Sequence, residues 1–166
     1  MANADRPRGA ECYGKVLRST KYIADAACYP GDFLEMTAAG KVQPASSATA
    51  AVLIGVCLSY ASADGDEVSV ADHPDQLFKV QSDDAAEPAA QTAIGLNYDL
   101  VITAGSSTYE ISRQEIDGDT GVVTAATPLR LIAIDERNDN AFGGNADCIV
   151  RINMHRLTQV VGETGL

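Results

Sequence analysis

The chain has 166 residues, of which 46% are apolar and 5% aromatic, and its formal net charge is −11. This length predicts one domain with a core of ordinary size, and the apolar share argues against disorder throughout the chain. The negative charge argues against nucleic acid as the main partner, because binding to phosphates needs a basic surface.

The charge is distributed unevenly along the chain. Residues 1–21 carry a net charge of +3, whereas residues 22–166 carry −14. A basic arm on an acidic body predicts that the arm contacts an acidic protein surface, which includes the surface of a second copy. The alternative is a solvated, frayed terminus. We therefore divide the chain into an extended basic N-terminal arm, residues 1–21, and a folded body, residues 22–166.

The four cysteines lie far apart in the sequence, without the Cys-x-x-Cys or Cys/His spacing of a zinc site. Cys57 and Cys148 lie in apolar runs and are interpreted as small buried side chains. The first residues do not have the pattern of a signal peptide, and the apolar run 48–61 is too short to cross a bilayer. These features predict an intracellular product with reduced thiols and no membrane partner.

The hydrophobic pattern is mostly that of short strands separated by turn signals. Within residues 31–45, extended pieces are expected on either side of a turn at Gly40. A hairpin is expected over residues 51–71, because Asp64-Gly65 suits a tight turn. The acidic, Ala-rich residues 82–92 predict a loop with one helical turn. The other expected strands are 77–81, 98–104, 107–112, 121–126, 128–136 and 148–157.

Several segments between these strands predict other structures. Ser112 to Glu115 fits a capping box, which predicts a brief helix. Asp117 to Gly121 resembles part of a calcium loop, but Pro128 occupies the position that needs a bidentate Glu, so a turn is the preferred interpretation. Residues 137–145 predict a hairpin loop. The carboxylates of residues 135–140 could attract a cation, although an Asx-rich loop is the preferred interpretation.

Roughly nine short strands without a long helical pattern predict an all-β fold: a β-barrel, a β-tulip-like domain or a sandwich. Residues 148–157 show the alternation of a strand that is covered on one face. We expect its apolar side chains to face the core and its polar side chains to face outward, where they could form a contact surface. The polar side chains are those of Arg151, Asn153 and His155.

The sequence contains no Gly-x-Ser-x-Gly elbow, phosphate-binding loop or dinucleotide fingerprint. Neither His73, in an expected loop, nor His155 has the neighbouring ligands or acids that a metal or catalytic histidine needs. Acidic pairs such as Asp83-Asp84 have a polar, surface-like setting. We therefore expect no catalytic residue, no metal and no cofactor.

The second half of the chain resembles a known family in the order of its elements. Gly95-Leu-Asn-Tyr-Asp99 precedes a strand, a short turn follows from Ser112 to Asp117, and Arg151-Ile-Asn-Met-His155 lies near the C-terminus. In this order, residues 89–157 resemble the head-decoration proteins of tailed bacteriophages, which are also called capsid cement proteins.

The resemblance implies a β-barrel or β-tulip domain on the outer surface of an icosahedral capsid. Such proteins commonly form homotrimers, bind the major capsid protein after the shell expands, and hold the shell against the pressure of packaged DNA. We therefore expect a structural virion protein that is made in the host cytoplasm. The residues expected at its protein interfaces are Arg6, Arg8, Tyr13, Lys15, Arg18, Lys21, Arg151, Asn153 and His155.

Other functions remain open. One is a hydrolase or lyase on a β-barrel, although the sequence identifies no nucleophile or base for it. A non-catalytic β-sandwich that binds carbohydrate would need two or three coplanar aromatic side chains to stack on sugar rings. The six Tyr and three Phe residues are scattered along this sequence, which argues against such a module. Another phage structural component, such as a tail-tube protein, would differ in the symmetry of its oligomer.

Overall fold

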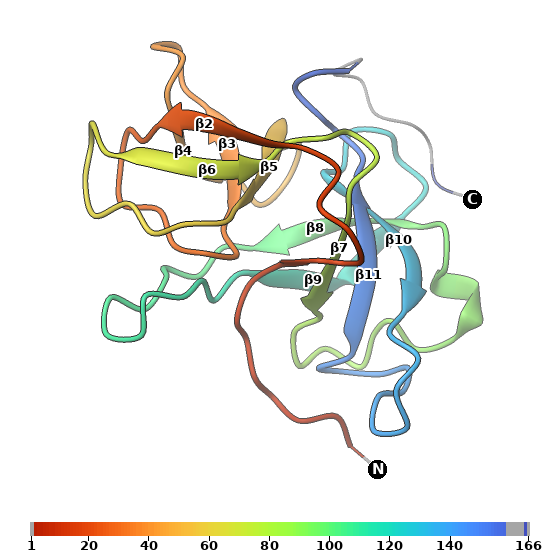
Figure 1. The fold of residues 1–166 in the computed structure, drawn as a ribbon. Coiled ribbons are helices and arrows are strands. Elements are labelled where there is room, and N and C mark those ends of the chain that lie inside the picture. Colours follow the sequence, from red (N-terminus) through yellow and green to blue (C-terminus); the bar gives the residue numbers. More distant parts are fainter. Residues whose placement is uncertain (1, 159–164, 166) are drawn as a thin grey trace.

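The computed structural model describes residues 2–158 and 165, so the last part of the body assigned to residues 22–166 lies outside the described residues. The described chain is all-β, as predicted, and forms a six-stranded and a five-stranded antiparallel sheet (Figure 1). The strands are β1 (Glu11–Cys12), β2 (Ser19–Ile23), β3 (Phe33–Met36), β4 (Val42–Pro44), β5 (Leu53–Cys57), β6 (Glu67–Ala71), β7 (Leu77–Gln81), β8 (Asn97–Val101), β9 (Glu115–Val122), β10 (Leu129–Ile134) and β11 (Asp147–Ile152).

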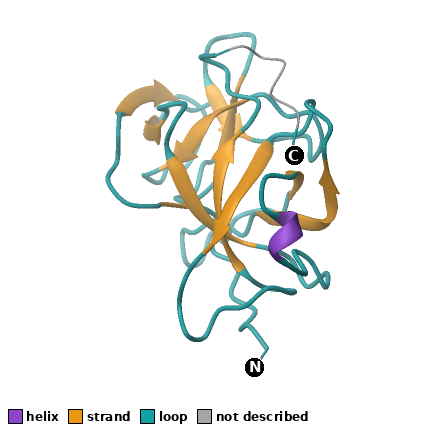
Figure 2. Cartoon of the chain, turned by 90° about the vertical axis from the view of Figure 1, so that its right-hand side faces the viewer, coloured by secondary structure: helices purple, strands orange, loops and turns teal. Residues whose placement is uncertain are grey.

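The two sheets lie next to each other, with the five-stranded sheet at the upper left and the six-stranded sheet at the lower right of Figure 1, and Figure 2 shows the same strands turned by 90°. The strand order is β1-β7-β11-β10-β8-β9 in one sheet and β2-β6-β5-β3-β4 in the other. Isolated parallel bridges join Ala24 to Val42 in the smaller sheet and Ser82 to Ile116 in the larger one. Among the described residues neither sheet closes into a barrel. Of the architectures predicted from the sequence, the sandwich is therefore the one that is consistent with the structure.

The buried apolar side chains form two clusters. The larger cluster lies between the sheets and includes Phe33 and Leu53 from the small sheet and Phe78 and Val150 from the large one. The rings of Phe33 and Phe78 meet edge to face, with centroids 6.1 Å apart. The smaller cluster is formed by residues from the N-terminal part of the chain alone: Ala24, Cys28, Leu34, Val42, Ile54, Cys57, Ala61, Val68 and Val70.

Three predicted hairpins are confirmed. β3 pairs with β4 around the turn at Gly40, β5 pairs with β6, and β10 pairs with β11. The predicted helical turn is present at the end of the loop that follows β7, as a 3₁₀ helix, η1 (Gln91–Ala93). Cys57 and Cys148 are buried, as the apolar runs around them predicted. Within the described residues, no helix has the length and apolar character needed to cross a bilayer.

Three predictions for the region between β8 and β10 are wrong, and the first two concern residues 107–115. Residues 107–112 do not form a strand but a turn closed by a single bridge between Ser106 and Ile111. No helix begins at Ser112; its buried side chain instead packs between Gly9 and Gly31, where a Cβ at either glycine would lie within 3.1 Å of the Ser112 Cβ. The predicted helix cap does not form because Ser112 packs between two segments that are distant from it in the sequence.

The turn predicted over residues 117–121 is also wrong, because these residues lie within β9. Gly118 and Gly121 do not reverse the chain; they allow neighbouring segments to pack closely against β9. A Cβ at Gly118 would lie 2.7 Å from the carbonyl oxygen of Glu87, and a Cβ at Gly121 would lie 2.9 Å from the ring of Tyr98. Sequence alone does not distinguish this use of glycine from its use in a turn.

The N-terminal residues take part in both sheets. β1 pairs with β7 at one edge of the six-stranded sheet, and β2 pairs with β6 at one edge of the five-stranded sheet. The change of charge at residue 21, which set the boundary between arm and body, falls inside β2. Between β1 and β2 the chain crosses from one sheet to the other (Figure 1).

Candidate functional site

The segment between β1 and β2, residues 13–18, is called here the N-terminal connection. Its backbone is fixed at two points: the Tyr13 N–H donates to the Leu77 carbonyl at 2.9 Å, and the Leu17 N–H donates to the Gln76 side-chain oxygen at 2.8 Å. Gln76 is itself buried, and its amide group donates to the Leu77 carbonyl. The connection is therefore held on the residues that precede and begin β7.

A cluster of charged and polar side chains fixes the end of the connection. The Arg18 guanidinium donates to the Asp72 carboxylate at 2.8 Å and to the Asp72 carbonyl at 2.9 Å. The Tyr22 hydroxyl donates to the second carboxylate oxygen at 2.8 Å. Burial by itself would raise the pKa of Asp72, which is 2% exposed, but the hydrogen bonds from Arg18 and Tyr22 outweigh it and hold that pKa below its usual value.

The side chains of the connection point outward although its backbone is held. Tyr13 is 47% exposed, Val16 40% and Leu17 51%, and Lys15 between them is exposed as well. Three neighbouring exposed apolar side chains, one of them aromatic, are a candidate for a surface that a partner covers. Because the backbone is already ordered, little conformational entropy would be lost when a partner binds.

The structure brings Arg151 close to this connection. Arg151 lies opposite Leu77 in the pairing of β11 with β7, and the Leu77 carbonyl accepts the Tyr13 N–H from the other side. Side chains opposite one another on adjacent strands share a face. Tyr13, Leu77 and Arg151 therefore form one row on the outer face of the six-stranded sheet. Arg151 also lies 3.9 Å from the Asp75 carboxylate.

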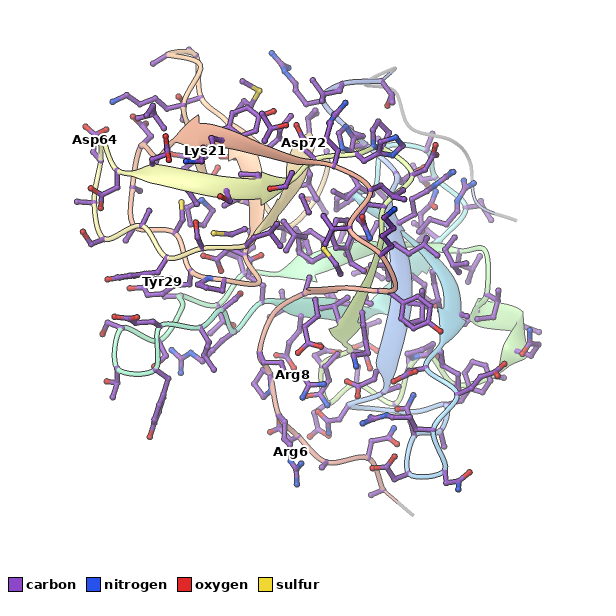
Figure 3. All side chains as sticks on the ribbon, viewed as in Figure 1. Arg6, Arg8, Lys21, Tyr29, Asp64 and Asp72 are labelled. Carbon is purple, nitrogen blue, oxygen red and sulfur yellow. The ribbon has the colours of Figure 1, made fainter. Side chains whose placement is uncertain are left out.

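Three of the other predicted interface residues lie elsewhere. Arg6 and Arg8 precede β1 near the N-terminal end of the chain, whereas Lys21 lies on β2 (Figure 3). Arg8 lies 3.2 Å from the Glu11 carboxylate and 3.8 Å from that of Asp147. Lys21 pairs with Glu67 across the edge of the five-stranded sheet, at 2.5 Å.

Asn153 and His155 do not face outward, and that prediction is wrong. β11 ends at Ile152, after which the chain turns and bridges to β5, so the alternation of the strand stops. The Asn153 amide donates to the carbonyls of Ala125 and Thr127, both at 2.9 Å. His155 is 2% exposed, and burial lowers its pKa to about 4, so it is neutral at pH 7. Both side chains are polar groups inside the fold.

The polar loop between β10 and β11 has the expected Asx-rich structure. The Asn140 amide donates to the carbonyls of Asp135 and Asp147, at 2.8 and 2.9 Å, and accepts the Asp147 N–H. The carboxylates of Asp135 and Asp147 both pair with Arg137. A cation at this loop would have to displace that guanidinium. Across the described residues, no three His, Cys, Asp or Glu side chains are placed to hold a metal ion.

A carboxylate cluster lies where β7 and β9 meet. Asp83 donates its N–H to the Ile116 carbonyl at 2.9 Å, and its carboxylate accepts the Gly118 N–H at 3.1 Å. Glu115, on the same strand as Ile116, has its pKa raised to about 7, first by partial burial and then by the charges of Asp5 and Asp83. This cluster therefore binds a proton near neutral pH.

The sequence predicted Tyr13, Lys15 and Arg18 as interface residues but did not identify Val16, Leu17, Asp72 or Gln76. An apolar pair in a polar, charged segment was a usable signal for the first two. Asp72 and Gln76 are distant in sequence and act only through the fold. Comparisons of the chain with protein-family models, with characterised proteins and with solved structures find no match.

Proposed function

We propose that the protein is a decoration protein of a phage virion, which binds the outer surface of an icosahedral capsid as a homotrimer and stabilises the expanded shell. Its partners are further copies of itself and the major capsid protein, and it acts without a cofactor. The resemblance of residues 89–157 to head-decoration proteins supports this assignment. The observation that carries it is the N-terminal connection, with its fixed backbone and exposed apolar side chains.

The energetics of the connection suit such a role. Full burial of a Val or Leu side chain contributes about 1.5–3 kcal/mol, so Val16 and Leu17 can make an appreciable contribution to binding. Because an ordered segment loses little entropy, more of this energy is available for binding than it would be from a flexible tail. In a trimer, three such contacts engage together, so each one can be weak.

The charge of the chain suits an outer location. A net charge of −11 favours a soluble free protein and repels DNA, which fits a protein that never contacts the packaged genome. Arg18 is neutralised by its ion pair with Asp72, so the exposed Lys15 gives the connection its local positive charge on an acidic molecule. This local charge would orient the connection toward an acidic surface.

The experiment that tests the proposal is co-sedimentation with expanded, undecorated phage heads, together with light scattering of the free protein. We expect saturable binding to the heads and a homotrimer in solution or on the shell. Leu17→Asp should reduce binding about tenfold or more, because it places a charge where burial is needed. Val123→Asp is the matched control, since Val123 is 54% exposed at the end of β9. A monomer that stays in the supernatant would exclude this function.

The alternative functions are a carbohydrate-binding module and a tail-tube protein. The structure brings Tyr29 and Tyr60 together with ring centroids 5.4 Å apart, a pairing that the sequence did not reveal. The rings face each other at 33° instead of forming a coplanar row, so at most one ring face is open to a sugar. Binding on a glycan array would favour the carbohydrate module, and a hexameric ring in electron micrographs would favour a tube.

A further inference from the structure

Tyr29, Tyr60 and Gly105 form a layered feature on the surface of the molecule, called here the tyrosine platform. Tyr29 precedes β3, Tyr60 follows β5, and Gly105 lies in the loop after β8. The Tyr29 ring lies directly on Gly105, because a Cβ there would be 2.3 Å from the ring. The Tyr60 ring packs on Tyr29 with the ring centroids 5.4 Å apart, and Tyr60 remains 37% exposed.

The backbone under the platform is fixed. Cys28 and Ala61, the neighbours of the two tyrosines, form an antiparallel bridge in which each N–H donates to the other's carbonyl at 2.9 Å. A mostly apolar hollow of about 420 Å³ lies next to the platform, because Pro30, which follows Tyr29, lines it together with Leu58 and Ile111. Arg8 and Glu11 are the charged residues of its lining. Leu58 and Ile111 are each 37% exposed, so this hollow is an uncovered apolar surface in the single chain.

The rim of the platform is acidic. Glu110 precedes Ile111, which lines the hollow, and Asp66 bonds to Ser62, two residues after Tyr60, so both carboxylates lie near the platform. Partial burial raises the pKa of Tyr60, and the interactions with Tyr29, Glu110 and Asp66 raise it further. Asp66 accepts hydrogen bonds from the Ser62 hydroxyl and backbone N–H at 2.7 and 2.8 Å, which lower its pKa and keep it ionised. An exposed aromatic face with carboxylates at its rim suits a cationic side chain flanked by apolar ones.

The N-terminal connection has this chemistry, with Lys15 between Tyr13 and the apolar pair Val16 and Leu17. The connection and the platform lie in different regions of one chain: Tyr29 is in the left part of Figure 3, whereas the red segment that leads into β2 runs through the middle of Figure 1. A single copy therefore presents both surfaces, but they do not cover each other.

We propose that the N-terminal connection of one copy docks on the tyrosine platform of the next copy, with Lys15 against Tyr60 and Glu110 and with Leu17 in the adjoining hollow. The inference rests on the proposed function in that it takes a second copy as the partner of the connection. The contact joins two different surfaces, so it repeats from copy to copy. It ends only when a ring closes, and a ring of three gives the proposed trimer.

A carbodiimide cross-link tests the contact in the unmodified protein. This reagent joins a lysine amine to a nearby carboxylate without a spacer, so a Lys15–Glu110 or Lys15–Asp66 bond reports direct contact. In a mixture of ¹⁴N- and ¹⁵N-labelled protein, mass spectrometry should find this cross-link between a light and a heavy chain. Its absence, while other cross-links between copies form, would overturn the inference.

Charge reversal provides a second, independent test. Lys15→Glu and Glu110→Lys should each weaken self-association about tenfold, because each places like charges opposite one another. The double variant should recover to within about threefold of the unmodified protein, since it restores the pair in reversed order. Asp119→Lys, on the exposed face of β9, is the matched control and should associate normally. Failure of the double variant to recover would count against the contact.

A mixing experiment distinguishes this contact from a symmetric one. Leu17→Asp removes one surface and Tyr60→Asp removes the other, so each variant alone should be a monomer. Mixed together, they still share one intact pair of surfaces and should form a 1:1 heterodimer that grows no further. If both variants stay monomeric in the mixture, the N-terminal connection of one copy does not dock on the tyrosine platform of another. If the protein sediments with heads but the cross-link does not form, the proposed function stands and this contact is excluded. If the cross-link forms but the protein does not bind heads, the contact stands and the proposed function is excluded.

Discussion

β5 and β7 are both five residues long, but they are buried differently. All five residues of β5 are buried, because Leu53 and Val56 face the six-stranded sheet while Ile54 and Cys57 face the smaller core. In β7, Phe78 and Val80 are buried in the core between the sheets, whereas Leu77 and Lys79 are only partly buried. The central strand of the small sheet thus packs on both faces, and β7 mainly on one.

The difference accounts for two sequence patterns. A strand covered on both faces gives a continuous apolar run, as in Leu53 to Cys57, whereas a strand covered on one face gives alternation, as in Leu77 to Gln81. It also couples the two cores, since β5 contributes side chains to both. We therefore expect the sheets to unfold together, and the following substitutions test that coupling.

The largest effect is expected from Phe78→Ala in the core between the sheets. The substitution removes a fully buried ring and its edge-to-face contact with Phe33, so it should cost about 4 kcal/mol of stability. Ile54→Ala in the smaller core should cost about 3 kcal/mol. In guanidinium denaturation, circular dichroism and tyrosine fluorescence should give coincident transitions for both variants. Two separate transitions for Ile54→Ala would show that the cores are independent.

A somewhat smaller effect is expected from Gly55→Ala in β5. A Cβ at this position would lie 2.1 Å from the Ala71 carbonyl oxygen, and backbone on the adjacent β6 has little room to move. We expect a loss of about 3 kcal/mol in the free energy of unfolding. Gly40→Ala is the control: nothing lies within 4 Å of its Cβ position, so only its φ of +76° opposes the change, at about 1 kcal/mol. Equal losses in the two variants would refute the steric explanation.

The smallest effect is expected at the carboxylate cluster of the larger sheet. The pKa of Glu115 is raised from 4.5 to about 7 in the folded protein, so the folded state binds the proton more tightly than the unfolded state does. Stability therefore falls as the pH rises between these two values and then levels off. Glu115→Gln should match the unmodified protein below pH 4.5 and be more stable above pH 7. The gain should be about 1 kcal/mol, since solvent screens a partly exposed carboxyl.

Thermal denaturation at several pH values would measure this difference. The prediction fails if Glu115→Gln and the unmodified protein have the same melting temperature at every pH. In that case Glu115 has the same pKa in the folded and unfolded states. The effect is confined to the large sheet, because the two carboxylates that raise the pKa of Glu115 lie next to strands of that sheet: Asp5 precedes β1 and Asp83 follows β7.

Much of the fold could be predicted from local patterns. The hairpins around Gly40 and over residues 51–71 follow from turn residues between apolar runs, and both are present. The wrong predictions occur where one residue type is found in two different structural settings. Gly118 and Gly121 indicated a turn but allow close packing inside β9, and Ser112 indicated a helix cap but packs against two glycines.

The candidate site was predictable only in part. The basic residues of the connection are visible in the sequence, but their support comes from Asp72 and Gln76, more than 50 residues away. The alternation of the sequence continues past Ile152 and predicts Asn153 and His155 on the surface, but β11 ends at Ile152. Tertiary hydrogen bonds to Ala125 and Thr127 bury Asn153 instead.

The sequence by itself determined the all-β class, the hairpin pairings and the local charge of the N-terminal segment, because period, turn residues and charge are properties of neighbouring residues. The tertiary structure decided which face of each strand is covered and which polar groups are buried. It also decided which distant side chains meet, as in the pair of Tyr29 and Tyr60. These features depend on contacts between segments that are remote in sequence, and such contacts leave no local pattern.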